Sequence, residues 1–493
     1  MSTSPKGIRR IILASSAGTV IEWYDFYIFG SLAAIISSQF FPKENPTAGF
    51  LATLAAFGVG FVIRPFGAIV FGRLGDLVGR KYTFLLTLMI MGGATFGIGL
   101  IPSYDSIGVA APIIVFVLRA LQGLALGGEY GGATTYVTEH APEGKKGFYT
   151  SFIQTTATLG LFISIGVILL CKSLMGDEAF REWGWRIPFL LSSVLVLMSF
   201  IIRRKLEESP EFTELKKAGK TSKNPLKESF GKWSNLKWVL IALFGATMGQ
   251  GVVWYTGQFY AMNFCTNTLH IDSSQIQKML LIVLVLGTPL FIFFAWLSDR
   301  IGRKWIMLSG IALAAIFYIP IYQAMANCRG HLDGKAEIDY SKKGVMEERV
   351  KANGDSVIYQ TFFLTDGIES QTTLEKPVGS DTWTSKNTMV LPINKIAFLG
   401  LLIFIQLIFV AMAYGPIAAF LVELFPANIR YTSMSLPYHI GNGVFGGLTP
   451  LIAETFVLKT GNMFAGLYYP VIVAAVTVVV GALLIRNKRP GVQ

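Results

Sequence analysis

The chain carries one short charged motif twice, and this repeat limits the possible folds more than any other feature. Residues 72–81 have the sequence GRLGDLVGRK, and residues 295–304 have the sequence AWLSDRIGRK. Four positions recur 223 residues later, namely Asp76, Gly79, Arg80 and Lys81 as Asp299, Gly302, Arg303 and Lys304. Each copy stands between two long apolar runs, which is typical of a tight basic turn joining two membrane helices. The sequence therefore predicts two copies of one membrane-embedded unit.

The composition supports a membrane protein independently of the repeat. Hydrophobic residues make up 52% of the 493 residues and charged residues only 15%, more apolar than is usual for a soluble chain of this size. Apolar runs of spanning length lie near 11–40, 52–71, 83–101, 110–132, 149–171, 187–202, 238–262, 278–297, 305–325, 396–422, 433–456 and 466–485. Each can cross about 30 Å of hydrocarbon. We therefore expect an all-α membrane protein with twelve transmembrane helices in two pseudo-symmetric bundles of six, embedded in a lipid bilayer.

The distribution of charge predicts the topology. The net charge is +12, but the Lys and Arg residues are spread over many loops, which argues against a nucleic-acid partner. In a twelve-span arrangement the cationic loops fall on one side, so both termini are expected in the cytoplasm of a bacterial cell, with the protein in the inner membrane. The first apolar run follows basic residues but has no small-residue cleavage site, so we expect it to be retained as a span.

The repeat also divides the chain into parts. We expect a first bundle at 1–202, a cytoplasmic linker at 203–237 and a second bundle at 238–493. Glu139 and Pro142 recur at Glu423 and Pro426, an offset of 284 residues, which is 61 more than the offset of the charged motif. The polar stretch 326–395, between the ninth and tenth runs, accounts for the excess and is predicted to be an external insertion. Its alternating pattern favours a small β-rich subdomain, and a disordered insert is the alternative.

Several functional classes find no support in the sequence. Three cysteines and four histidines are too few and too scattered to suggest a metal site, and no cofactor is indicated. The nucleotide-binding pattern Gly-x-x-x-x-Gly-Lys-Ser/Thr does not occur, so transport would be driven by a gradient. Cys265 and Cys328 fall near external helix ends, and a disulfide between them is an open possibility.

Charged residues at membrane depth are the strongest candidates for a functional site. The first half contains Glu22 and Asp25, three residues apart on one helix face, together with Arg64, Arg119 and Glu129. A charge at the centre of a membrane helix costs roughly 2.5–3.5 kcal/mol on the insertion scale, so such residues are functional candidates by default. We interpret them as contacts for substrate or for a carried proton. The alternative is a set of structural ion pairs that fix helix packing.

The second half carries aromatic and amide side chains instead of charges. The candidates are Gln250, Trp254, Tyr255, Gln258, Tyr260, Gln406, Tyr414, His439 and Asn442. This composition favours shape and hydrogen-bond selectivity rather than charge binding. Trp254 and Tyr260 are equally consistent with core or interface positions.

Taken together, the motifs resemble those of the major facilitator superfamily, and specifically its bacterial metabolite:proton symporter family. The repeated charged loop is the superfamily signature, and the narrower matches are Glu22-Trp-Tyr-Asp-Phe-Tyr27, Arg64-Pro65, Arg119-x-x-Gln-Gly123, Gly127-Gly-Glu-Tyr-Gly131, Glu182-Trp-Gly-Trp-Arg-Ile-Pro-Phe189, Glu207-Glu-Ser-Pro-Glu-Phe212 and Gly441-Asn-Gly-Val-Phe-Gly-Gly447. The resemblance implies a monomeric symporter that imports a small carboxylated metabolite with a proton by alternating access. A zwitterionic osmolyte such as proline or betaine is the alternative substrate.

The resemblance and the residues together suggest roles for individual positions. Glu22, Asp25 and Glu129 are candidates for proton coupling, and Arg119, assisted by Arg64, for binding a substrate carboxylate. Further candidate substrate contacts are Tyr27, Tyr255, Gln258, His439 and Asn442. The motif residues Asp76, Arg80, Asp299 and Arg303 are expected to hold the inward gate shut.

Two other functional classes stay open at this point. A non-transporting membrane sensor is one, and a membrane enzyme that uses Glu22 and Asp25 as acid and base is the other. The sequence shows no nucleophile or ligand set for an enzyme, so we expect none.

Overall fold

The computed structural model describes residues 5–42, 46–328, 339, 344–350, 356–364, 367–376 and 382–486. The first half consists of helices α1 (Pro5–Ser31), α2 (Ala33–Phe40), α3 (Pro46–Leu77), α4 (Arg80–Leu100), α5 (Tyr104–Ile107), α6 (Ala110–His140), α7 (Lys146–Gln154), α8 (Thr156–Met175), α9 (Asp177–Ala179), η1 (Phe180–Gly184) and α10 (Arg186–Arg204). Two short helices follow, α11 (Pro210–Lys217) and α12 (Pro225–Phe230). They lie within the predicted linker, while α10 extends two residues into its predicted range.

The second half has more interruptions. It comprises α13 (Trp233–Ala242), η2 (Leu243–Thr247), α14 (Met248–Tyr255), η3 (Thr256–Tyr260), α15 (Ala261–Asn263), η4 (Phe264–Thr268), α16 (Ser273–Ile301), α17 (Arg303–Asn327), α18 (Ile393–Tyr414), α19 (Ile417–Leu424), α20 (Arg430–His439), η5 (Ile440–Gly446), α21 (Thr449–Thr460), η6 (Ala465–Leu467) and α22 (Tyr468–Leu484). The elements η2, η3, η4 and η5 are π-helical, a conformation often found at functional sites.

The spans agree with the expected membrane fold. Within the described residues, ten helices are long and apolar enough to cross a bilayer, and α1 with α2, bent by 66°, would make an eleventh. The run predicted at 433–456 is divided among α20, η5 and α21, because Pro437 and several glycines interrupt the regular helix there. With that broken span the twelve-helix arrangement is complete.

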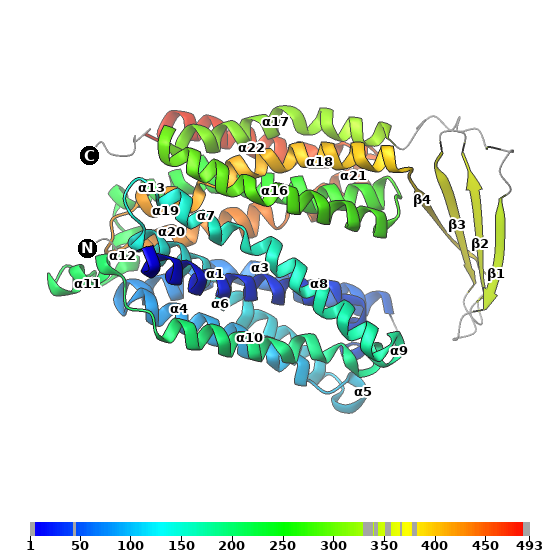
Figure 1. Cartoon of the computed structure of the whole chain (residues 1–493), viewed down its shortest axis with the longest axis horizontal. Helices are drawn as coiled ribbons and strands as arrows, with labels where there is room; N and C mark the ends of the chain where they lie inside the picture. The colour runs from blue at the N-terminus through cyan, green and yellow to red at the C-terminus, as the bar shows by residue number, and fades with distance from the viewer. Residues whose placement is uncertain are drawn as a thin grey trace.

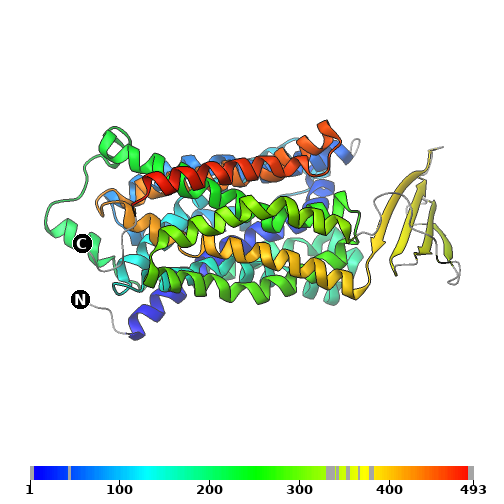
Figure 2. The same cartoon turned by 90° about the horizontal axis from the view of Figure 1, so that it is seen from above.

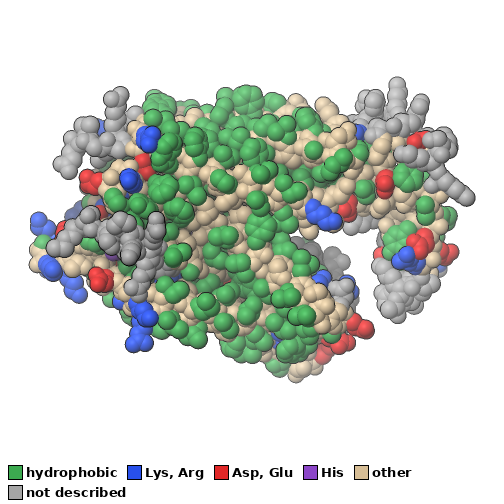
Figure 3. All heavy atoms as spheres, viewed as in Figure 1, with side chains coloured by type: hydrophobic (Ala, Val, Ile, Leu, Met, Phe, Trp, Pro, Cys, Tyr) green, Lys and Arg blue, Asp and Glu red, His purple; other side chains and the backbone are tan. Residues whose placement is uncertain are grey.

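The molecule consists of two bundles whose helices run roughly along its long axis (Figures 1 and 2). In Figure 1 the helices of the first half lie below those of the second, and both termini lie at the same end. Figure 3 shows hydrophobic side chains covering the middle of the visible face, with most Lys and Arg residues near the end that carries the termini. Large apolar side chains such as Phe66 (61% exposed) and Leu286 (61% exposed) would be unfavourable in water and match a lipid surface.

The insertion forms a small antiparallel sheet at the end opposite the termini (Figure 1). Strands β1 (Val345–Val350), β2 (Ser356–Phe363), β3 (Glu369–Lys376) and β4 (Thr384–Val390) pair in the order β1-β2-β3-β4. This confirms the β-rich interpretation for the described part of the insertion. Met389 of β4 exchanges backbone hydrogen bonds with His270 and Asp272 at 2.7 and 2.8 Å, which ties the sheet to the loop before α16.

Close backbone contact between α3 and α6 positions the central charged residues. A Cβ atom at Gly67 would lie 1.9 Å from the carbonyl oxygen of Leu124, and one at Gly127 would lie 2.2 Å from the carbonyl oxygen of Arg64. Only glycine permits such an approach, as in other membrane helix pairs with small residues at the interface. Arg64 is therefore held against α6 by its own backbone.

We expect Gly67→Ala to destabilise the protein by about 1–3 kcal/mol, because the new methyl group overlaps the backbone of α6. Thermal unfolding in detergent measures this as a lower unfolding temperature. Gly93→Ala is the matched control, since a Cβ atom there meets nothing within 4 Å. Equal unfolding temperatures for the two variants would contradict the close packing of α3 and α6.

Candidate functional site

A small cavity of about 30 Å³ lies between the two halves, close to the middle of the molecule. The first half lines it with Thr19, Glu22, Trp23, Arg64, Tyr130, Ile153 and Thr156, and the second half with Trp254, Tyr255, Tyr414, Tyr438, His439 and Asn442. This volume suits about one water molecule. A metabolite can therefore enter only if the halves move apart, so this conformation is closed around the site.

The two central arginines lack acidic partners. In the part of the chain that the structure describes, ion pairs in the bundles involve Arg80, Arg203, Arg303 and Arg430, whereas neither Arg64 nor Arg119 pairs with a carboxylate. The guanidinium carbon of Arg64 lies 4.5 Å from the ring centre of Phe61. The Nε atoms of both arginines are buried without a hydrogen-bond partner. The alternative of structural ion pairs with Glu22 and Asp25 is thus not what the geometry shows.

Asp25 and Arg119 are connected through two neutral side chains instead. Arg119 donates a hydrogen bond to Gln122 Oε1 (2.7 Å), Gln122 donates to Thr95 Oγ1 (2.6 Å), and Thr95 donates to Asp25 Oδ2 (2.6 Å). All four residues are buried. The Arg119 guanidinium also lies 4.3 Å from the ring centre of Phe29. This chain of contacts adjoins the cavity without forming its lining.

Glu129 has a different environment from the other two acids. Its carboxylate forms an ion pair with Arg203 at 2.6 Å and accepts a hydrogen bond from Thr87 at 2.9 Å. Both partners of the ion pair are 1% exposed, and Glu129 is not among the residues that line the cavity. The sequence had assigned Arg203 to the linker, so this pair was missed.

Aromatic side chains close the cavity on the side of the termini. The rings of Tyr130 and Tyr438, one from each half, stack with centres 3.6 Å apart and an interplanar angle of 3°. Tyr414 and Tyr438 share a hydrogen bond between their hydroxyl groups at 3.0 Å. Trp254 packs on Trp23 across the interface, with ring centres 5.4 Å apart. Trp254 is buried in the hydrophobic core, as the sequence allowed, and also lines the cavity.

The first copy of the charged motif connects the two halves near the termini. Asp76, close to the end of α3, accepts hydrogen bonds from the backbone N–H groups of Tyr431 (3.3 Å) and Thr432 (2.8 Å) in the first turn of α20. The same carboxylate pairs with Arg80 at 3.2 Å. A carboxylate in this position satisfies free N–H groups and interacts favourably with the helix dipole.

The second copy makes the same contact in the opposite direction. Asp299 accepts hydrogen bonds from the N–H groups of Gly147 (2.8 Å) and Phe148 (2.7 Å) in the first turn of α7, and pairs with Arg303 at 3.0 Å. Arg303 in turn holds Glu423 through two nitrogen atoms at 2.6 and 2.7 Å. Each half thus caps a helix of the other, and both contacts must break if this end of the molecule opens.

The comparisons with known proteins agree with this architecture. The family model described as "Sugar (and other) transporter" matches residues 11–233. The shikimate transporter of Escherichia coli (strain K12) is 39% identical over 320 residues, covering 64% of this chain and 72% of the relative. The alpha-ketoglutarate permease of the same strain is 32% identical over 499 residues, covering 100% of this chain and 97% of the relative. The chain belongs to the major facilitator superfamily.

Two further comparisons bear on substrate and fold. The glycine betaine/proline/ectoine/pipecolic acid transporter OusA of Dickeya dadantii (strain 3937) is 30% identical over 486 residues, covering 97% of this chain and 83% of the relative. The solved structure of the major facilitator proton:xylose symporter XylE bound to 6-bromo-6-deoxy-D-glucose superposes with a TM-score of 0.70 at 15% identity, covering 98% of this chain and 97% of that one. As a member of the superfamily the chain is a multi-pass secondary transporter of metabolites and not an enzyme.

In this major facilitator protein the predicted site residues separate into two groups. Five line the cavity, namely Glu22, Arg64, Tyr255, His439 and Asn442. The others lie outside its lining, namely Tyr27, Asp25, Arg119, Glu129 and Gln258. Asn442 exchanges amide hydrogen bonds with Gln250 at 2.9 and 3.1 Å, so Gln250 holds it in place. Tyr130 and Tyr438 were not predicted to take part, although Tyr438 directly precedes His439.

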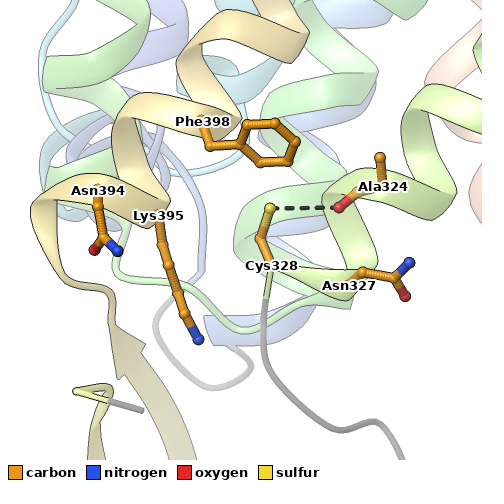
Figure 4. Close-up of a pocket in the computed structure, with 6 residues that line it drawn as sticks. All are labelled: Ala324, Asn327, Cys328, Asn394, Lys395 and Phe398. Carbon is orange, nitrogen blue, oxygen red and sulfur yellow. Dashed lines mark hydrogen bonds between the residues drawn. The ribbon is translucent and has the colours of Figure 1, made fainter.

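A second pocket lies at the far ends of α17 and α18, near the sheet (Figure 4). Its volume is about 310 Å³, and its lining residues are Ala324, Asn327, Cys328, Asn394, Lys395 and Phe398. Cys328 bonds through its sulfur to the carbonyl oxygen of Ala324 at 3.3 Å. Cys265 and Cys328 are both free thiols, so the structure does not contain the disulfide that the sequence left open. The pocket is remote from the central charges.

Asp76→Asn is expected to impair turnover more than substrate affinity, because Asp76 contacts α20 and not the cavity. Loss of a helix cap costs roughly 0.5–2 kcal/mol, which changes a conformational equilibrium by about twofold to thirtyfold. Equilibrium binding and transport rate, measured on the same preparation, separate the two effects.

Asp105→Asn, at an exposed position of the short helix α5, is the control for this experiment. If Asp76→Asn loses substrate affinity but transports bound substrate at the normal rate, Asp76 is not a gate residue.

Proposed function

We propose that this protein is a proton-coupled symporter that imports a small carboxylated metabolite by alternating access. The observation that carries the proposal is the pair of membrane-embedded arginines without a carboxylate partner, one of which faces the cavity. Burying a guanidinium without a direct ion pair is expensive, so the site is suited to an anionic group delivered by the substrate. A carboxylate can accept two parallel hydrogen bonds from one guanidinium.

The residues that line the cavity have different roles in the proposed binding of the substrate. Arg64 supplies the charge for the substrate carboxylate, and His439 and Asn442 from the second half offer neutral hydrogen-bonding groups opposite it. The Nε2 atom of His439 is buried without a partner, as is Nε of Arg64. Arg119 lies outside the cavity lining and packs against Gly60 of α3. In this closed conformation it contributes positive electrostatic potential to the site, and direct contact with a substrate would require the halves to separate.

The coupling proton has two candidate carriers on α1. Glu22 lines the cavity, and Asp25 connects to Arg119 through Thr95 and Gln122. When a carboxylate arrives at the arginines, the positive field felt by these acids decreases, so substrate binding and proton binding influence one another. That mutual effect is the thermodynamic requirement for symport.

Alternating access is supported by the two aspartate caps. Both lie at the end that carries the termini, and the stacked rings of Tyr130 in α6 and Tyr438 in the last turn of α20 stand at the cavity wall. With the termini in the cytoplasm, these contacts close the inner side, and the sheet faces the outside. The protein would act as a monomer in a bacterial inner membrane.

A zwitterionic substrate is the second candidate because of the aromatic lining. Trp23, Trp254 and Tyr255 stand beside the carboxylate of Glu22 in the cavity wall, an arrangement that can hold a quaternary or secondary ammonium group. Arg64 would then bind the carboxylate of the same molecule. OusA, which is named as a transporter of betaine and proline, is similar over nearly the whole chain.

Proteoliposomes with an imposed pH gradient test both candidates. We expect uptake of at least one of 2-oxoglutarate, shikimate, citrate, proline and betaine to rise when the outside is acidic and to fall when a protonophore removes the gradient. Preferential uptake of proline or betaine selects the zwitterion. Uptake of a candidate that ignores the gradient would contradict proton coupling, and no uptake of any candidate would favour a non-transporting sensor.

Arg64→Lys and Arg119→Lys are expected to weaken uptake, by about 10-fold or more for Arg64, because an ammonium group cannot make the paired hydrogen bonds of a guanidinium. Initial rate and affinity are compared at matched surface expression. Arg181→Lys, on the exposed outer surface, is the control. Near-normal affinity and rate in Arg64→Lys would exclude direct contact with the carboxylate, and the same result in Arg119→Lys would restrict that residue to a structural role.

A further inference from the structure

Four side chains form the hydrogen-bonded row from Arg119 to Asp25, and for three of them the donor and acceptor roles are fixed. Arginine has no acceptor, so Gln122 must present its carbonyl oxygen to Arg119 and its amino group to Thr95. Thr95 Oγ1 accepts that hydrogen bond and has a single hydrogen left to donate. Two acceptors compete for it, Asp25 Oδ2 at 2.6 Å and the carbonyl oxygen of Met91 at 3.0 Å.

The state of Asp25 decides between these acceptors. When Asp25 is ionised, the shorter contact and the negative charge hold the Thr95 hydrogen on Oδ2. When a proton binds Oδ2, one new O–H bond forms, Oδ2 becomes a weaker acceptor, and the Thr95 hydrogen is free to turn to the carbonyl oxygen of Met91. No other bond breaks, and the proton later leaves Asp25 towards the inner side.

The groups around Asp25 leave the row through Thr95 and Gln122 as the main connection between its carboxylate and a charged side chain. The charged group that faces it from α6 is Arg119, and Glu22 stands one turn earlier on α1. Tyr24 adds a titratable hydroxyl on the same helix, which donates instead to the carbonyl oxygen of Pro188 at 2.8 Å. Among the described residues of α8 and α10, no charged side chain acts on Asp25. Its other oxygen, Oδ1, is buried without a partner.

We propose that Thr95 and Gln122 form a hydrogen-bond relay that links the protonation of Asp25 to the position of the Arg119 guanidinium. The inference rests on the proposed symport and adds two positioning residues to it. When Asp25 is ionised, all three hydrogen bonds of the relay are formed, and Arg119 stays bonded to Gln122. Protonated Asp25 releases the Thr95 hydrogen, weakens the hold on Gln122 and frees Arg119 to move towards the anionic substrate. Such networks are stronger than isolated pairs because each bond polarises the next.

The direct test is an infrared pH titration of the purified protein in lipid, without substrate. The carboxylic acid band of Asp25 is identified by its loss in Asp25→Asn. We expect Thr95→Val to displace the midpoint of this band by about one pH unit, a tenfold change in proton affinity, and Gln122→Met to displace it as well. Thr95→Ser keeps the hydroxyl and should match the wild type.

Thr477→Val is the control for removing a buried hydroxyl, because Thr477 is fully buried in α22 and donates only to the carbonyl oxygen of Val473 at 2.9 Å. A wild-type midpoint in a folded Thr95→Val protein would overturn the relay. If Thr95→Val fails to fold, the midpoint of the Asp25 band in Gln122→Met is measured instead, and a wild-type value there would also overturn the relay.

Transport by the same variants separates the relay from the proposed function. With 2-oxoglutarate or shikimate, whichever the wild type accumulates, Thr95→Val should retain exchange of labelled for unlabelled substrate and lose most accumulation driven by a pH gradient. Gradient-driven accumulation equal to that of the wild type would overturn the relay and leave symport intact. A wild type that exchanges substrate but never responds to pH would overturn the proposed function and the relay together.

Discussion

Two guanidinium groups held inside the membrane without acidic partners are the constraint on which the rest of this structure depends. Arg64 and Arg119 are placed there by the glycine-mediated contact of α3 with α6, which leaves little freedom to retreat. The protein surrounds them with aromatic rings, Phe61 for one and Phe29 for the other, which stabilise a cation without neutralising it. Neither guanidinium forms a direct ion pair, and this is the basis for the proposal that the site binds an anionic group.

The aspartate caps connect the two halves of the molecule at the end that carries the termini. Because Asp76 holds α20 and Asp299 holds α7, each contact spans the boundary between the halves, and neither half can rotate without breaking both. The linker takes part as well: Glu208 accepts hydrogen bonds from the backbone N–H groups of Arg80 and Lys81, and Glu211 pairs with Arg430. The end that carries the termini is thus closed by a network of helix caps and ion pairs, the kind of contacts that break and re-form as units in conformational transitions.

Much of the fold could be predicted from the sequence. The hydropathy shows which segments lie within the membrane, and the repeated motif shows that the two halves are related. The helix-capping contacts follow the repeat: positions 147 and 148 correspond to positions 431 and 432 by the offset of 284 that relates Glu139 to Glu423, and Asp299 and Asp76 bind these two helix starts. That these contacts act as a gate stays a prediction. The β-rich insertion followed from alternation along Val357 and its neighbours.

The cavity itself was harder to predict, because the rotation of each helix decides which side chains meet. Arg119 and Glu22 were both candidates at membrane depth, yet only Glu22 faces the cavity, while Arg119 points towards Gln122. The π-helical segments shift the facing residues further, which no regular period anticipates. Arg203 was hidden by its position at a helix end, where cations usually mark the topology and not a buried ion pair.

A thermodynamic cycle of binding measurements tests whether Arg64 recognises a carboxylate. The affinity of the transported acid and of its uncharged methyl ester would be measured in the wild type and in Arg64→Gln. The account predicts that the wild type prefers the acid by about 10-fold or more and that Arg64→Gln loses this preference, since the paired charged hydrogen bonds are gone. An equal preference for the acid in both proteins would contradict it.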